Sequence, residues 1–143
     1  MSKMSPEMQS CIDECLRCYQ TCLGMAMSHC LEAGGKHVAA GHLRTMMACA
    51  EMCRTSAHFM LIGTDHHKHT CAECAEICEA CAKSCEQMGG IETCVQQCRR
   101  CADSCRKMAP AAHRPSRRGR EAVGSPANGS SLRQAQRHVL TSA

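Results

Sequence analysis

Residues 71–88 read CAECAEICEACAKSCEQM and place cysteine at positions 71, 74, 78, 81 and 85. The steps of 3, 4, 3 and 4 follow the heptad rhythm, which sets all five side chains on one stripe of an α-helix. Disulfides fit this spacing poorly. Cβ atoms three or four residues apart on a helix are about 5–6 Å apart, whereas a disulfide needs about 3.8 Å. The stretch therefore predicts a helix with one face lined by thiols.

The same stripe recurs in three other segments, and methionine or histidine extends it at the ends. Of the sixteen cysteines, only Cys30 lies off these stripes. The stripes are Met4, Met8, Cys11, Cys15, Cys18, Cys22, Met25 and His29; His42, Met46, Cys49, Cys53, Ser56 and Met60; His67, Cys71, Cys74, Cys78, Cys81, Cys85 and Met88; and Ile91, Cys94, Cys98, Cys101, Cys105 and Met108.

Glycines and a proline separate the four segments. Gly34 and Gly35 follow the first segment, Gly63 the second and Gly89 the third, and Pro110 ends the fourth. Thr64 or Asp65 is a suitable N-cap for the third helix, and Gly89 suits a helix C-terminus. We expect helices at 5–31, 38–62, 66–88 and 91–109. Short connections make successive helices antiparallel, so the fold class is all-α, an up-down-up-down four-helix bundle with a cysteine-lined core.

The predicted core contains few large apolar side chains. Residues 1–110 hold eleven Ile, Leu or Val and no tryptophan. A chain this poor in apolar groups buries too little surface to fold by the hydrophobic effect alone. Sulfur side chains must therefore fill much of the interior.

The composition changes after Pro110. Residues 111–143 carry six arginines against Glu121 and include several glycines and prolines. We expect a bundle domain at 1–110 and a disordered basic tail at 111–143, with a short helix near 131–140 as an alternative within it. The tail has no interleaved aromatic residues, so no nucleic-acid partner is expected.

Fifteen thiols along one axis indicate that the core binds metal. If the cysteines served only as small apolar side chains, Ala or Leu would pack as well without the risk of oxidation. Thiolates select Cu(I), zinc or iron–sulfur clusters. Buried thiolates need matching cations. One Cu(I) per thiolate gives a neutral core, whereas Zn²⁺ held by four thiolates leaves a charge of −2. The spacing therefore favours many Cu(I) ions, bridged by shared cysteines.

Three other functions remain to be weighed. An iron–sulfur electron carrier is disfavoured, because the CxxCxxC triplet and the loop that wraps a cluster are absent. A CxxC redox enzyme would need a βαβ context, so the protein is not expected to be an enzyme. A general zinc or cadmium buffer is the alternative that the sequence excludes least.

Methionine and histidine gather where the predicted helices end. Alternating helix direction brings Met25, Met27, His29, Cys30, His37, His42 and Met88 to one end. The opposite end collects Met4, Met8, Met60, Met108, His58, His66, His67 and His69. Thioethers bind Cu(I) without losing a proton, which suits transient sites. We interpret the first group as the copper entrance.

The N-terminal sequence MSKMSPEMQSCIDEC shows no apolar signal region, and no apolar run reaches the roughly 18 residues of a membrane span. We therefore expect a cytoplasmic protein without membrane contact. A reducing cytosol agrees with cysteines used for metal rather than for disulfides.

The segments CIDECLRCYQTC, ACAEMC, HTCAECAEICEACAKSC and TCVQQCRRCADSC resemble those of the bacterial copper storage proteins, most closely the cytosolic branch. The resemblance covers residues 5–110. It implies Cu(I) storage in each bundle, a homotetramer, and copper uptake where the end of helix one, the start of helix two and the third connection meet. The sequence departs from the family at His42, where a cysteine is expected, and in the connection EQMGGIET, which lacks a His-rich stretch.

The expected copper ligands are all sixteen cysteines and four residues at the entrance. They are Cys11, Cys15, Cys18, Cys22, Cys30, Cys49, Cys53, Cys71, Cys74, Cys78, Cys81, Cys85, Cys94, Cys98, Cys101, Cys105, Met25, His29, His42 and Met88.

Overall fold

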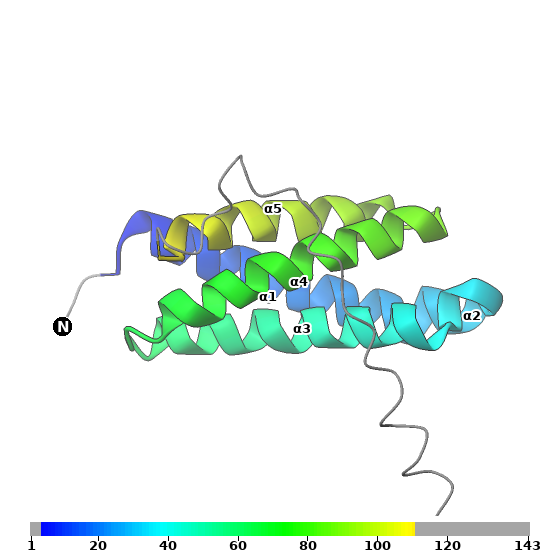
Figure 1. Cartoon of the computed structure of the whole chain (residues 1–143), viewed down its shortest axis with the longest axis horizontal. Helices are drawn as coiled ribbons and strands as arrows, with labels where there is room; N and C mark the ends of the chain where they lie inside the picture. Colours follow the sequence, from blue (N-terminus) through cyan, green and yellow to red (C-terminus); the bar gives the residue numbers. More distant parts are fainter. Residues whose placement is uncertain (1–3, 111–143) are drawn as a thin grey trace, which may run out of the picture.

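The computed structural model describes residues 4–110. Residues 111–143, which include the predicted basic tail and the alternative helix near 131–140, lie outside this range. The described chain is all-α, as the heptad stripes predict (Figure 1). Its long helices are α1 (Pro6–Met25), α3 (Ala40–Leu61), α4 (His67–Met88) and α5 (Glu92–Met108). A π-helix (Ala26–Cys30) and the short helix α2 (Leu31–Ala33) continue α1, and a 3₁₀ turn (Gly35–Val38) leads into α3.

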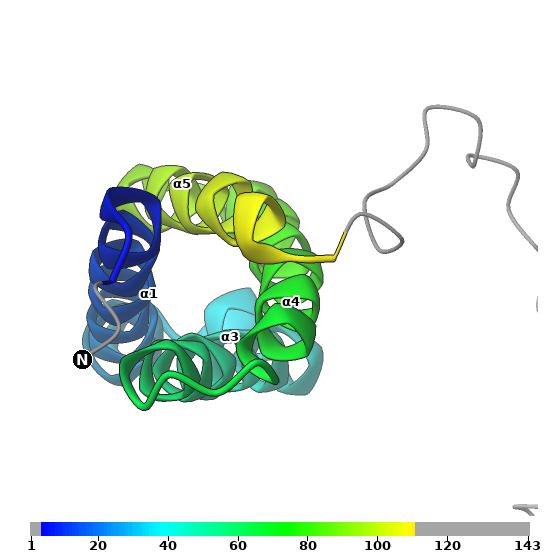
Figure 2. The ribbon, with the colours of Figure 1, turned by 90° about the vertical axis from the view of Figure 1, so that its left-hand side faces the viewer.

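The four long helices form a closed ring. Helix α1 packs on α3, α3 on α4, α4 on α5 and α5 on α1, so each helix borders its neighbours in the chain. Figure 2 shows this ring from the end at which α1 begins. The short connections make neighbouring helices antiparallel, which confirms the up-down-up-down bundle.

The helix ends follow from local chemistry. Ser5 caps α1 because its hydroxyl accepts the Met8 N–H at 3.1 Å, and Pro6 occupies the first turn, where no N–H is needed. Gly89 ends α4 at φ 73°, a conformation that favours glycine. The predicted capping of α4 is wrong. His66 is its N-cap residue and makes no side-chain cap bond, while the Thr64 hydroxyl accepts only the His66 N–H, at 3.4 Å.

Sulfur fills the interior, as the scarcity of aliphatic residues predicts. All sixteen cysteines have 0% exposed surface, as do Met46 and Met60. The buried aliphatic residues Ile12, Ile91 and Val95 belong to the same core cluster. Polar contacts with Glu14 tie α5 to α1: the buried Gln97 amide donates to a Glu14 carboxylate oxygen at 2.7 Å, and Arg100 lies 3.9 Å from the same carboxylate.

No helix among residues 4–110 is long and apolar enough to cross a membrane.

Candidate metal centre

The thiols form one connected network along the bundle axis. Sulfur–sulfur distances of 3.5–4.0 Å link fourteen of them across all four long helices. In the middle, Cys53 lies 3.7 Å from Cys74, 3.5 Å from Cys78 and 3.8 Å from Cys101. The 3, 4 spacing places each sulfur between sulfurs of its own and neighbouring helices.

Groups of four sulfurs within 4.8 Å of one another recur along the axis. They share members, so one thiol belongs to more than one group: Cys15, Cys74, Cys101 and Cys105; Cys18, Cys49, Cys53 and Cys78; Cys18, Cys22, Cys49 and Cys98; Cys22, Cys81, Cys94 and Cys98; and Cys53, Cys74, Cys78 and Cys101. At most three of these five groups can be filled without sharing a cysteine. Sharing suits ions that are bridged by common thiolates.

Hydrogen bonds and burial set the thiol pKa values. Hydrogen bonds from Cys101 and Cys22 lower the pKa of Cys18, and hydrogen bonds from Cys22 and Cys49 lower the pKa of Cys81. The bond with Cys18 raises the pKa of Cys22, and burial raises it further. Neighbouring sulfurs therefore share protons, and the thiols titrate as a group rather than one by one. All sixteen cysteines are free thiols.

Cys30 and Cys71 lie outside that network of fourteen, at opposite ends of the bundle. The Cys30 sulfur lies 3.8 Å from the Met46 sulfur, and the Cys71 sulfur lies 3.8 Å from the Met60 sulfur. The row of sulfurs therefore reaches a thiol paired with a thioether at each end.

At the end of the bundle formed by the π-helix and the start of α3, His42 joins the Cys30 pair. Its Nε2 lies 3.7 Å from the Cys30 sulfur and its Nδ1 lies 2.7 Å from the Ser84 hydroxyl oxygen. The serine fixes the ring, as an outer-shell partner of a metal-ligating histidine does. Burial lowers the pKa of His42, so the imidazole stays neutral. Burial likewise raises the pKa of the Cys30 thiol. The trio combines a thiol, an imidazole and a thioether.

The π-helix brings Cys30 into this trio. The heptad stripe predicts Met25 and His29 on the axis and leaves Cys30 off it, but the structure buries Ala26 and Cys30 instead. Ser28 donates its hydroxyl to the Gly24 carbonyl at 2.6 Å, a local bond that competes with the helix ladder. The wider π turn shifts the register, and no periodic sequence pattern signals it.

The other predicted entrance residues surround the trio more loosely. Met25 and Met88 are partly buried against the core. The half-buried His29 ring meets the His37 ring edge-on, with centroids 5.3 Å apart. Nδ1 of His37 is buried without a hydrogen-bond partner among residues 4–110. Sequence reasoning left Met46 and His37 out of the ligand set, although Met46 lies on the second stripe.

Solved structures of known proteins share the fold of this chain. A protein of Nitrosospira multiformis, Nmul_A1745, has a crystal structure that is 65% identical in sequence; the match covers 72% of this chain and 94% of that one, with a TM-score of 0.71. The Cu(I)-bound copper storage protein BsCsp3 is 32% identical over 73% of this chain and 99% of its own, with a TM-score of 0.67.

A relative of known sequence is YhjQ, an uncharacterised cysteine-rich protein of Bacillus subtilis strain 168. It is 34% identical over 77 residues, which are 54% of this chain and 70% of YhjQ. The model of the copper storage protein family matches residues 4–110, the whole of the described bundle. The chain therefore belongs to the copper storage protein family.

Proposed function

We propose that the thiol network of this chain stores many Cu(I) ions, on the order of one per core thiolate. The observation that carries the proposal is the continuous set of sulfurs 3.5–4.0 Å apart, such as Cys22 to Cys98 at 3.5 Å and Cys18 to Cys49 at 4.0 Å. Two metal–sulfur bonds of about 2.3 Å span at most about 4.6 Å. An ion bound to two such sulfurs therefore sits about 1–1.5 Å off the line between them, where a third thiolate can complete a trigonal site.

Charge supports monovalent copper. Every one of these thiols is buried, and an unmatched buried thiolate is costly. One Cu(I) per thiolate neutralises the network along its whole length. The Cu(I)-bound state of BsCsp3, a relative with the same fold, supports the same ligand.

A second candidate is a zinc or cadmium buffer, because the four-sulfur groups also suit a tetrahedral divalent ion. The five groups above would accept three such ions without sharing. Each tetrathiolate zinc site would keep a charge of −2 inside a narrow core. That charge limits divalent loading far below one ion per thiol.

Anaerobic titration separates the two functions. Reduced apoprotein is titrated with Cu(I), and separately with Zn²⁺, against a competing chelator, and bound metal is counted after gel filtration. We expect Cu(I) to saturate at roughly the number of thiols and Zn²⁺ at about three or four. A Cu(I) plateau at four or fewer would overturn the proposal.

We further propose that copper enters beside Cys30, His42 and Met46, with Met25, His29 and Met88 around them. The support is positional, because these donors continue the thiol network to the bundle end. Neutral imidazole and thioether hold Cu(I) less tightly than thiolates do, so ions can pass inward.

The cytosol is the proposed location. Support comes from the sixteen free thiols. Many of them have another sulfur within 4.0 Å, and thiols this close stay reduced only in a reducing compartment. The bundle, residues 1–110, is the proposed storage unit, since every cysteine lies between 11 and 105. A chain ending at Pro110 should keep its full copper capacity.

Assembly into a homotetramer is also proposed. Among residues 4–110, all the exposed large apolar side chains lie between 16 and 62, on the α1–α3 half: Leu16, Met27, Leu31, Val38, Met47, Leu61 and Ile62. Exposed apolar surface on one side favours association. Light scattering should give four copies, and Leu16→Lys with Met47→Lys should reduce that number. An unchanged mass would contradict this interface.

A further inference from the structure

We infer a second soft-metal site at the end of the bundle where α1 begins, built from thioethers and one imidazole and specific for Cu(I) or Ag(I). It deepens the proposed storage function, since it would exchange ions with the thiol network from the side opposite the proposed entrance. Figure 2 looks onto this end of the ring.

The site has a cavity of its own. A space of about 360 Å³ is lined by donors from three segments: Met4 just before α1 and Met8 in its first turn, Met60 at the end of α3 and His67 at the start of α4. Met60 is fully buried and His67 is 8% exposed. Met4 and Met8 are partly buried against the core. Three thioethers and an imidazole around one cavity are soft, neutral ligands that bind monovalent copper without deprotonation.

His67 is oriented for ligation. Its Nδ1–H donates to the Thr64 carbonyl at 2.8 Å, so Nε2 keeps its lone pair. A hydrogen bond from one ring nitrogen to a carbonyl is how metal-ligating histidines are commonly held. His67 begins α4 four residues before Cys71, so both lie on the same face of the helix.

The cavity connects to the thiol network through sulfur. The Met60 sulfur lies 3.8 Å from the Cys71 sulfur. Interactions with Cys105 and Cys11, whose sulfurs lie 3.7 Å apart, shift the pKa of the Cys71 thiol. At the other end, Met46 and Cys30 form the same pair of a thioether and a terminal thiol. Both ends therefore offer one thiol, one thioether and one buried histidine.

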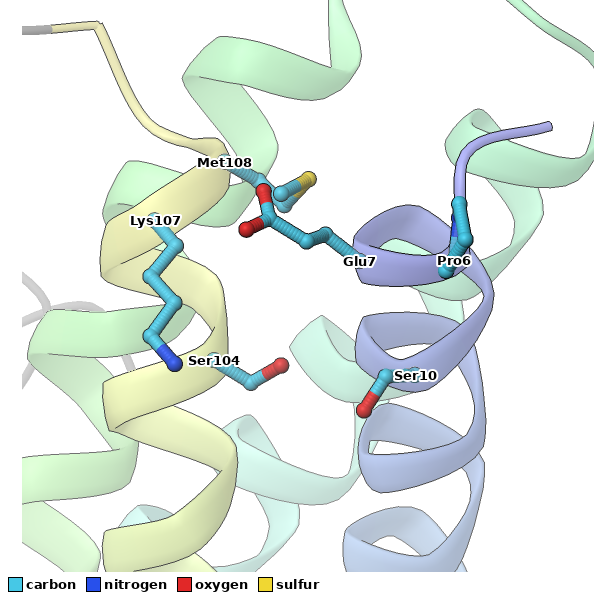
Figure 3. A pocket seen from close by; sticks show the side chains of 6 residues that line it. All are labelled: Pro6, Glu7, Ser10, Ser104, Lys107 and Met108. Atoms are coloured by element: carbon cyan, nitrogen blue, oxygen red, sulfur yellow. The ribbon is translucent and has the colours of Figure 1, made fainter.

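The rim of this end carries acidic groups and a further thioether. Asp65 lines the cavity. Beside it, Met108 and Glu7 line a smaller hollow between α5 and α1 of about 240 Å³. Figure 3 shows Met108 reaching from α5 toward α1, next to the Glu7 carboxylate, while Lys107 extends along α5 away from it. Carboxylates at the rim attract cations before the soft donors bind them.

Ag(I) titration of protein with ¹³C-labelled methionine methyl groups tests the site directly, because Ag(I) mimics Cu(I) without redox chemistry. We expect the thiolate ultraviolet band to develop first. The Met8 and Met60 methyl resonances, identified by single Met→Leu variants, should then shift together. Met27, which the sequence groups with the entrance but which is 49% exposed in the structure, should not shift with them.

The matched variants are His67→Gln and His58→Gln, which carry the same substitution at the same end. His58 is exposed and does not line the cavity. His67→Gln should move the methionine shifts to higher free Ag(I), and His58→Gln should leave them unchanged. Methyl resonances that stay fixed while the thiolate band forms would overturn this site alone. Absence of the thiolate band would instead overturn the proposed storage function. Met8→Leu gives the same comparison if His67→Gln does not fold.

Discussion

At the scale of single residues, the sequence identifies the cysteines of the core. It identifies only some of the histidines and methionines that contact them. Heptad spacing places fifteen of the sixteen cysteines on the bundle axis, and the structure buries all fifteen; Cys30, which the stripes leave out, is buried as well. Spacing does not say which histidine meets which sulfur. His42 reaches Cys30 because Ser84 on α4 holds its ring, and that contact depends on helix packing. Met46 lies on the same stripe as His42, and spacing alone does not distinguish a methionine ligand from a methionine that only packs in the core.

His42→Gln and Met46→Leu should each slow Cu(I) uptake and leave the final loading within about one ion of the parent. Each change removes a weak donor at the proposed entrance but keeps every thiol. Stopped-flow transfer from a Cu(I) donor complex measures the rate. Met52→Leu is the control, since Met52 is a partly buried methionine of α3 that lies off the four stripes. Equal rates in all variants would remove these residues from the path.

At the scale of secondary-structure elements, the four long helices and their order follow from the stripes and the glycines between them. The helix boundaries agree to within a few residues. The exception is the π-helix, which the 3, 4 rhythm cannot reveal because it adds a residue to one turn. Gly24 and Ser28 are its local signal, through the hydroxyl bond to the Gly24 carbonyl.

Deletion of Met27 should convert the π turn into an α turn. The shorter turn rotates Cys30 by about 100° around the helix axis, away from His42 and Met46. We expect Cys30, which is fully buried in the parent, to become reactive toward iodoacetamide, as peptide mass spectrometry would detect. Uptake should slow as well. Met27→Ala, which keeps the chain length, should do neither, and Cys30 protected in the deletion variant would contradict the assigned role of the π turn.

At the scale of the whole molecule, the apoprotein is a bundle held by sulfur contacts and few aliphatic side chains. Ligands that bind only the folded state stabilise it by about 4 kcal/mol per site at a thousandfold excess over Kd. One kcal/mol raises the melting temperature of a domain of this size by about 4–8 °C. Cu(I) loading should therefore raise the melting temperature of the reduced protein by tens of degrees. Coincident calorimetric transitions of apo and loaded protein would contradict binding inside the core.

Apoprotein stability should also depend on pH on both sides of neutrality. Folding raises the pKa of the Cys30 thiol through burial. The stability that this thiol contributes is complete below the unfolded pKa of about 8.5 and is lost as pH rises above it. Burial lowers the pKa of His42, so its contribution is lost as pH falls below about 6.5. Urea unfolding should show a maximum between these values. Loaded protein should not lose stability between pH 8.5 and 10, because metal has replaced the thiol protons.

The most direct test of Cu(I) storage in the thiol network is a crystal structure of the fully loaded protein with anomalous data at the copper edge. The account predicts a row of copper peaks along the bundle axis, from Cys71 at one end to Cys30 at the other, each bonded to two or three thiolates at about 2.3 Å. Copper confined to surface histidines, with the central thiols around Cys53 and Cys101 unoccupied, would contradict it.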